Sequence, residues 1–254
     1  MPNLIRLVYR NILVNTDPGS LIILIGLPGM YLIFFGFGFQ SVASAGGGSS
    51  TSYLSYLTPG IMSFQVVMAG SVGGSMLWAD RRWGMLSQLL MGPFTRLQYL
   101  FGIMLTSILF GLGGSAVMLG VAYALLGTGP TQLYSYGIIF ATITLGSIFF
   151  GGLMLYISAL VKSNTAYNSI QILILFVVNF ASTVFYPLSN GLPVVLKVLF
   201  EVNPLTYVAD AVRGAYSSTL TAMDLYQLLV LIAEMSAILF LAVRAYMRSD
   251  VSYE

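Results

Sequence analysis

Few side chains in this sequence could do chemistry, and none is spaced as a catalytic set requires. The chain has no histidine and no cysteine, so it lacks the usual general base, the commonest metal ligand and a thiol nucleophile. It also lacks a G-x-x-x-x-G-K-S/T sequence, the P-loop that holds nucleotide phosphates. We therefore expect no catalytic residue, no metal site and no cofactor bound by this chain, and its basic residues do not predict nucleic-acid binding.

The densest charges lie in residues 79–96, ADRRWGMLSQLLMGPFTR, between two long apolar stretches. We predict a short amphipathic helix here, suited to transmit force from a soluble partner to two flanking membrane spans. The alternative for Arg81 and Arg82 is that they only anchor the chain at the membrane surface. The candidate coupling residues are Asp80, Arg81, Arg82, Trp83, Gly84, Met85, Leu86 and Arg96.

Glu234 is an acidic residue near the middle of an otherwise apolar stretch. Carboxylates inside a membrane are costly and are therefore hypotheses for function. Glu234 favours an ion-coupled transporter or channel as one alternative function. The other interpretation is structural, with the carboxyl group protonated or satisfied by hydrogen bonds from a neighbouring helix.

The elements that position these residues are membrane spans. Only 7% of the residues are charged, 57% are hydrophobic and the mean hydropathy is +0.90, whereas soluble domains are about a quarter charged. A bilayer core needs about 20 apolar residues per helix. We predict an all-α membrane protein forming one transmembrane domain over residues 1–254. Its six spans are 21–39, 57–78, 99–126, 136–161, 170–188 and 225–243.

The basic residues predict which side of the membrane each connection faces. With the N-terminus inside, eight lysines and arginines fall on the inner side, and only Lys197 and Arg213 on the outer side. A lysine and arginine excess marks cytoplasmic loops. We expect a multi-pass protein of a prokaryotic-type plasma membrane, with both termini and residues 79–96 in the cytoplasm. The inner residues are Arg6, Arg10, Arg81, Arg82, Arg96, Lys162, Arg244 and Arg248.

Residues 2–16 have apolar positions at helical spacing, and Arg6 and Arg10 lie one turn apart. This pattern predicts a helix lying flat on the inner leaflet, with both arginines reaching the lipid headgroups. A signal peptide cleaved near Ala43-Ser44-Ala45 is the alternative. The apolar run is longer than a signal core, which favours the interfacial helix.

Three further features suggest breaks or close contacts between helices. Pro28 predicts a kink in the first span, either static or used as a hinge. Gly70 and Gly74 form a GxxxG pair that favours close helix packing, within one bundle or between subunits. Residues 192–200 and 205–216 predict two short helices at the outer leaflet, re-entrant or lying on the surface. They are separated by Asn203-Pro204, because the residue before a proline disfavours helix.

Asp210 and Arg213 are three residues apart on the second of these short helices and can form an ion pair. We treat this outer region, the first-span proline and two mid-membrane side chains as candidates for the substrate path or its gating. The candidates are Pro28, Phe64, Asn203, Pro204, Asp210, Arg213 and Glu234.

Three motifs occur in order along nearly the whole chain. They are Tyr56-Leu57-Thr58-Pro59-Gly60, then Asp80-Arg81-Arg82-Trp83-Gly84 with Gly92-Pro93-Phe94-Thr95-Arg96, then Asn203-Pro204-Leu205-Thr206 with Asp210-Ala211-Val212-Arg213. Together with the topology, they resemble the six-helix permease subunits of ABC-2 type exporters, of the daunorubicin-resistance kind. The sequence departs from that pattern at Asp80, where the family commonly has glutamate, and in its doubled arginine.

The resemblance implies a non-catalytic permease that works with a separate ABC ATPase subunit, present in two copies, which binds ATP and Mg²⁺. That ATPase would contact residues 79–96 and the N-terminal helix. A second permease subunit, identical or different, would complete the path in the lipid membrane. The apolar spans favour export of a drug-like or lipid-like substrate. The alternatives are a polysaccharide exporter of the same architecture, an ion-coupled transporter and a non-transporting scaffold.

Overall fold

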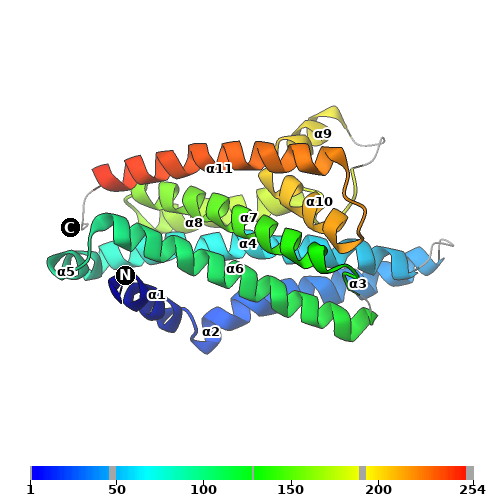
Figure 1. Ribbon diagram of the computed structural model, residues 1–254, viewed down its shortest axis with the longest axis horizontal. Coiled ribbons are helices and arrows are strands. Elements are labelled where there is room, and N and C mark those ends of the chain that lie inside the picture. Colours follow the sequence, from blue (N-terminus) through cyan, green and yellow to red (C-terminus); the bar gives the residue numbers. More distant parts are fainter. Residues whose placement is uncertain (1, 46–49, 128, 189–192, 250–254) are drawn as a thin grey trace.

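The computed structural model describes residues 2–45, 50–127, 129–188 and 193–249, and all of its regular secondary structure is helical. The helices form an elongated bundle in which α5, the start of α1 and the end of α11 lie at the same end (Figure 1). The elements are α1 Pro2–Val14, α2 Pro18–Leu21, the π-helical η1 Ile22–Gly26, α3 Leu27–Ala45, α4 Ser50–Arg82, α5 Met85–Met91, α6 Arg96–Leu126, α7 Leu133–Leu160, α8 Asn164–Phe180, α9 Val194–Glu201, α10 Pro204–Tyr216 and α11 Ala222–Arg248.

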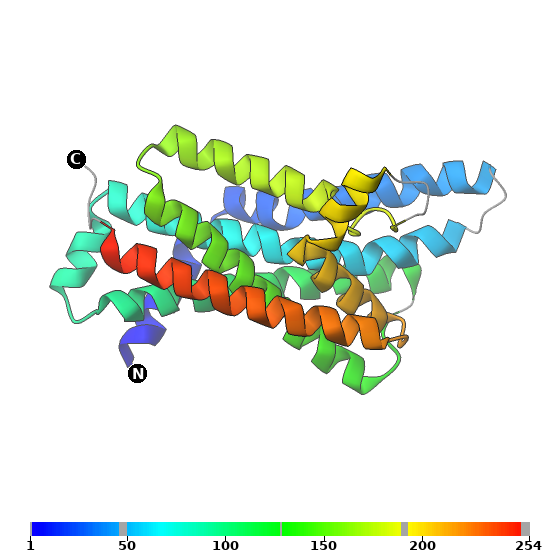
Figure 2. The same cartoon turned by 90° about the horizontal axis from the view of Figure 1, so that it is seen from above.

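Helix α4 is the centre of the bundle and is almost entirely buried. It packs against α3, α6, α7 and α10, whereas α11 packs mainly on α7 and α10 (Figures 1 and 2). Many apolar side chains of α11 are exposed. A Cβ atom at Gly70 would lie 2.6 Å from the carbonyl carbon of Phe150, and one at Gly74 would lie 2.8 Å from the carbonyl oxygen of Met154. The two glycines therefore let α4 approach α7 within one bundle.

Five stretches of the described residues are long and apolar enough to cross a membrane. The capping boxes at Thr95–Gln98 and Thr221–Asp224 set the starts of α6 and α11, each three residues before the predicted span. The predicted first, second, third, fourth and sixth spans therefore all have a counterpart. The five stretches are Pro18–Gly36, Tyr53–Arg82, Arg96–Ala124, Leu133–Leu160 and Ala222–Arg248.

The predicted fifth span, 170–188, differs from the structure. Helix α8 begins six residues earlier and ends at Phe180, so its 17 residues extend over about 26 Å, less than a hydrocarbon core of about 30 Å. The helix stops because the side chain of Asn203 binds the carbonyl oxygens of Val178 and Ala181, and the following residues pack against α4 instead. A membrane crossing by α8, in addition to the five candidate spans, thus remains a prediction.

The first span is irregular where Pro28 predicts a break. The π-helical η1 ends at Gly26, and Pro28 follows as the second residue of α3, buried against its neighbours. Proline has no N–H to donate to the preceding turn, and π-turns are common at such irregularities. Use of this kink as a hinge stays a prediction.

The prediction of one helix over residues 79–96 is wrong. Helix α4 runs on to Arg82, and Gly84 then adopts a left-handed conformation with φ of +69° that ends the helical path. Only Met85–Met91 form the short helix α5, and Arg96 is already the first residue of α6. The charged residues of the segment therefore belong to the ends of two long helices.

Candidate functional site

At the end of the bundle that contains α5, a buried carboxylate joins three helices. Asp80 on α4 accepts a hydrogen bond of 2.6 Å from Nη1 of Arg10 on α1, and Nη2 of Arg10 binds its other oxygen. The hydroxyl of Tyr99 on α6 donates to Asp80 at 2.7 Å. The hydrogen bond with Asp80 raises the pKa of Arg10 above its usual value.

This geometry corrects one prediction for the N-terminal helix. Arg6 is exposed, but Arg10 turns inward towards Asp80 and does not extend to the headgroups. The reason is that helix α1 packs along α6 with Leu7 and Val8 buried, which places Arg10 beside the end of α4.

Two further arginines bind the carboxyl ends of helices. Arg81 is 1% exposed and donates to the carbonyl oxygens of Ser158 and Ala159 at the end of α7, at 3.1 and 3.4 Å. Arg96 donates in the same way to Met247 and Ser249 at the end of α11. Cations are favourable at these negative helix ends. The prediction that Arg81 contacts a partner directly is wrong, because the residue is enclosed within the chain.

The exposed surface of α5 and of the turn before it is largely apolar and aromatic. Trp83 is 75% exposed and Met91 is 82% exposed, while Leu86 is buried and fixes α5 to the bundle. The guanidinium of Arg82 lies 5.3 Å from the ring centre of Trp78 and 5.6 Å from that of Trp83. A notch of about 310 Å³ opens here between α4 and the start of α8.

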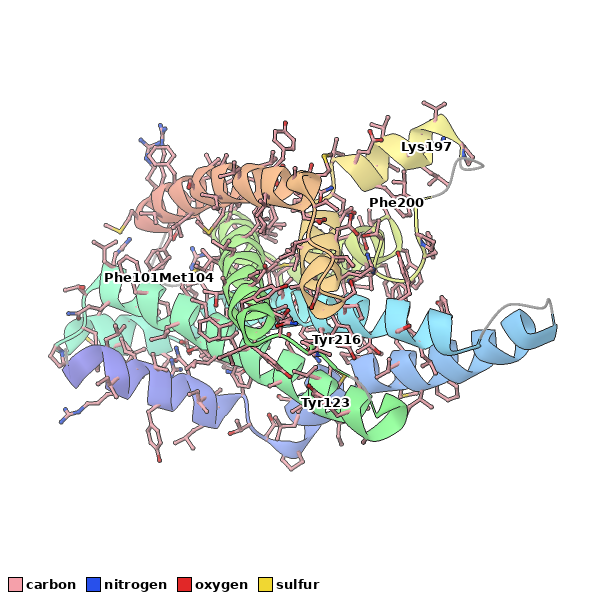
Figure 3. All side chains as sticks on the ribbon, turned by 45° about the vertical axis from the view of Figure 1, so that its right-hand side comes forward. Phe101, Met104, Tyr123, Lys197, Phe200 and Tyr216 are labelled. Carbon is pink, nitrogen blue, oxygen red and sulfur yellow. The ribbon has the colours of Figure 1, made fainter. Side chains whose placement is uncertain are left out.

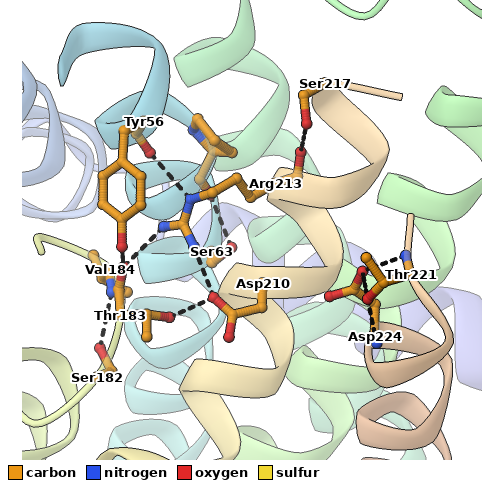
Figure 4. Close-up of polar contacts among 11 residues, drawn as sticks. Tyr56, Ser63, Ser182, Thr183, Val184, Asp210, Arg213, Ser217, Thr221 and Asp224 are labelled. Carbon is orange, nitrogen blue, oxygen red and sulfur yellow. Dashed lines mark hydrogen bonds and ion pairs between the residues drawn. The ribbon is translucent and has the colours of Figure 1, made fainter. Parts of the chain in front are cut away.

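At the opposite end, Arg213 on α10 joins three segments (Figure 4). Its guanidinium lies 3.8 Å from the ring centre of Tyr56 on α4 and donates to the carbonyl oxygen of Thr183 at 2.8 Å. The predicted ion pair with Asp210 is confirmed, at 2.7 Å, and the hydroxyl of Thr183 donates to the same carboxylate. Burial raises the pKa of Asp210, and the charge of Arg213 opposes that shift.

Asn203 and Pro204 build the junction between α8 and α10. The side-chain oxygen of Asn203 accepts from the backbone N–H of Leu205 and caps α10, and Pro204 occupies its first turn. The amide nitrogen of Asn203 donates to two carbonyl oxygens at the end of α8, both at 2.7 Å. The predicted helix break is confirmed here; Leu192, in the first predicted short helix, lies outside the described residues.

The other candidates for the substrate path lie apart from this group. Phe64 is buried in an aromatic cluster, with its ring centre 5.6 Å from that of Tyr31 and 6.4 Å from that of Phe185. Glu234 is half-buried on α11, and its Oε2 has no hydrogen-bond partner among the described residues. The structure thus brings together Asn203, Pro204, Asp210 and Arg213 but not Pro28, Phe64 or Glu234.

A separate cavity of about 320 Å³ lies between the first span, α4 and α8. Most of its lining is apolar, and Ser71, Ser75 and Gln171 supply polar atoms. Sequence reasoning did not identify this cavity, nor Tyr99 and Thr183 as partners of the two carboxylates. No local pattern marks these residues, because each is paired with a group on another segment.

Comparisons with known proteins agree with this architecture. The family model described as "ABC-2 type transporter" matches residues 3–216. A protein named "Putative transport permease ycf38" from Porphyra purpurea is 30% identical over 215 residues, covering 80% of this chain and 69% of that protein. A protein of the same name from Cyanophora paradoxa is 29% identical over 210 residues, covering 79% and 70%. The chain is a multi-pass membrane protein and belongs to the ABC-2 type transporter family.

Proposed function

We propose that this chain is the permease subunit of an ATP-driven exporter that moves a hydrophobic or amphiphilic substrate out of the cytoplasm. Membership of a transporter family and the relatives named as transport permeases support the permease role. The lack of a P-loop supports a separate ATPase subunit, in two copies, that binds ATP and Mg²⁺. A second permease subunit faces this one across the substrate path.

In this proposal the end with α5 and both termini is cytoplasmic, and α8 is a sixth, short crossing. The inner excess of basic residues supports the orientation. Helices α9 and α10 form a re-entrant pair at the outer end, which their short lengths and their position opposite α5 support (Figures 1 and 2). Arg213 and Asp210 then fasten that pair to α4.

The observation that carries the proposal is the Arg10–Asp80–Tyr99 cluster behind the exposed face of α5. An ATPase that docks on Arg82, Trp83 and the notch beside them pushes on the end of α4. Because Asp80 on α4 binds both α1 and α6, a force on the end of α4 is transmitted to all three helices and does not bend α4 alone. Asp80 and Arg81 thus act as positioning residues, while Arg82, Trp83 and α5 make the contact.

The cavity between the first span, α4 and α8 supports the proposed substrate class. Its apolar lining with a few polar groups suits an amphiphile that is exchanged with the surrounding lipid. The described residues lining it include no charged side chain, which disfavours a highly charged polymer. A polysaccharide exporter is the alternative that a transport assay with labelled sugar polymers would detect.

The experiment compares Arg82→Glu with Lys197→Glu, each purified gently from its native membrane with whatever ATPase accompanies it. Lys197 is a half-buried cation on α9 at the opposite end of the bundle (Figure 3). Reversing Arg82 places a negative charge beside Trp83 and is expected to reduce co-purified ATPase activity and export at least tenfold. The Lys197 variant is expected to keep both.

Unchanged export by the Arg82 variant would remove the coupling role of this surface. A permease that purifies without any ATPase in several detergents would favour the ion-coupled alternative. Glu234→Gln decides that case in the same assay, because an ion-coupled carrier that uses this carboxylate would lose transport, whereas the ATP-driven exporter keeps it.

A further inference from the structure

A cleft of about 450 Å³ lies between the ends of α7 and α11 and shares no lining residue with the Arg82 notch. Four cations line it: the buried Arg81 and the exposed Lys162, Arg244 and Arg248. Among the described residues that line it there is no aspartate or glutamate; Asp250 and Glu254 lie outside the described part of the chain. Within the described part of the chain, the cleft therefore concentrates positive charge without a counter-ion.

The cleft is also amphipathic, with cations at one end and apolar side chains at the other. Leu241, Arg244, Ala245 and Arg248 follow the spacing of one helix face, so the cations lie at the end of α11 and the leucine lies about one turn deeper. On α7 the order repeats, with Leu160 before Lys162. Leu160 is 56% exposed and Leu241 is 40% exposed, so an apolar wall adjoins the charges on the membrane side.

The four cations differ in whether they already bind other groups of the chain. Arg81 uses its guanidinium on the carbonyl oxygens at the end of α7. Lys162, Arg244 and Arg248 are exposed and make no hydrogen bond or ion pair within the described residues. Like charges held around one cleft repel one another, and an anion between them removes that cost.

We propose that this cleft binds the phosphate of an anionic amphiphile, whose chain lies along Leu160 and Leu241. Basic pockets between membrane helices on the cytoplasmic side recognise anionic lipid headgroups, and guanidinium groups match phosphate oxygens geometrically. The general excess of inner cations does not require such a cleft, since Arg6 and Arg82 belong to that excess and line other surfaces. A free phosphate would use the cations but not the apolar wall.

The test titrates the full chain, purified in neutral detergent, with short-chain phosphatidylglycerol, with phosphatidylcholine of the same chain length, and with inorganic phosphate. Bound lipid is counted by native mass spectrometry. The double variant Arg244→Gln, Arg248→Gln is compared with Arg6→Gln, Arg82→Gln, which removes two cations at the same end but outside the cleft. Thermal unfolding without lipid checks that both variants are folded.

Phosphatidylglycerol is expected to bind more tightly than phosphatidylcholine. Each cleft cation contributes about fivefold, so the cleft variant should weaken phosphatidylglycerol binding about 25-fold, and the control variant less than twofold. Equal binding of the two lipids, or equal loss in both variants, would overturn the proposal. If inorganic phosphate displaced phosphatidylglycerol at a concentration equal to that of the lipid, the ligand of the cleft would be a free anion. If the cleft variant lost a co-purifying ATPase but kept its lipid affinity, these cations would belong to a protein contact. Either of these two results would overturn the proposal that the cleft binds an amphiphile.

Discussion

Asp80 shows how single residues at the end that contains α5 connect helices. Its carboxylate is almost completely buried, and it binds Arg10 and Tyr99 from two other elements. A carboxylate in this environment is tolerated only because its charge and lone pairs are satisfied. Arg10 and Arg81 therefore contribute to helix packing, and the exposed Arg82 is the charge of this segment that remains accessible to a partner.

Replacing Asp80 with asparagine should destabilise the end that contains α5, because Arg10 loses its counter-ion while staying half-buried. We expect the free energy of unfolding to fall by about 2 kcal/mol, and by about 1 kcal/mol in Tyr99→Phe, which keeps the ion pair. Denaturant titration in mixed micelles measures both changes. Arg10→Gln combined with Asp80→Asn should cost less than the sum of the single variants, and strict additivity would show that the pair does not couple.

Local patterns predicted local structure well and contacts between helices poorly. The break at Asn203-Pro204 and the pairing of Asp210 with Arg213 follow from short spacings. The pairing of Arg10 with Asp80 joins residues 70 positions apart, and it depends on how two helices rotate against each other, which no local pattern gives. Gly84 was a signal that could have separated α4 from α5, because glycine favours the left-handed stop at a helix end.

At the scale of elements, α10 is the helix that holds together the end of the bundle opposite α5. Ten of its 13 residues are buried, and it contacts α4, α7 and α11. Its amino end is fixed to α8 through Asn203, and its last turns are fixed to α4 through Arg213. The first and third sequence motifs thus meet at one place, where Tyr56 supplies the ring and Arg213 the cation.

Arg213→Lys should loosen α10 although the charge is kept. A lysine cannot stack on Tyr56 and donate to both Asp210 and Thr183 with the fixed geometry of a guanidinium. We expect the amide hydrogens of α10 to exchange about tenfold faster, as for a local opening eased by about 1.4 kcal/mol, while those of α5 keep their rate. Arg82→Lys at the other end is the matched control. Unchanged exchange in α10 would show that packing alone holds the helix.

At the scale of the whole molecule, the two ends of the bundle carry different chemistry. The end with α5 holds the termini, most of the cations, the notch beside Arg82 and the basic cleft. Open apolar faces of α8 and α11 lie between the ends and are available to lipid or to a second permease subunit. The proposed export mechanism requires the α5 end to be cytoplasmic, so the orientation is the property on which the proposal depends.

The absence of cysteine makes that orientation directly measurable, because one introduced thiol is the only one in the chain. A thiol in Met91→Cys reports on the end that contains α5, and one in Leu133→Cys reports on the opposite end. The two native side chains are 82% and 87% exposed, so the fold itself buries neither position. We expect a membrane-impermeant maleimide to label Leu133→Cys on intact cells and Met91→Cys only after permeabilisation. The reverse pattern would place α5 outside the cell, where no ATP-driven subunit can reach it, and would remove the coupling mechanism along with the export direction.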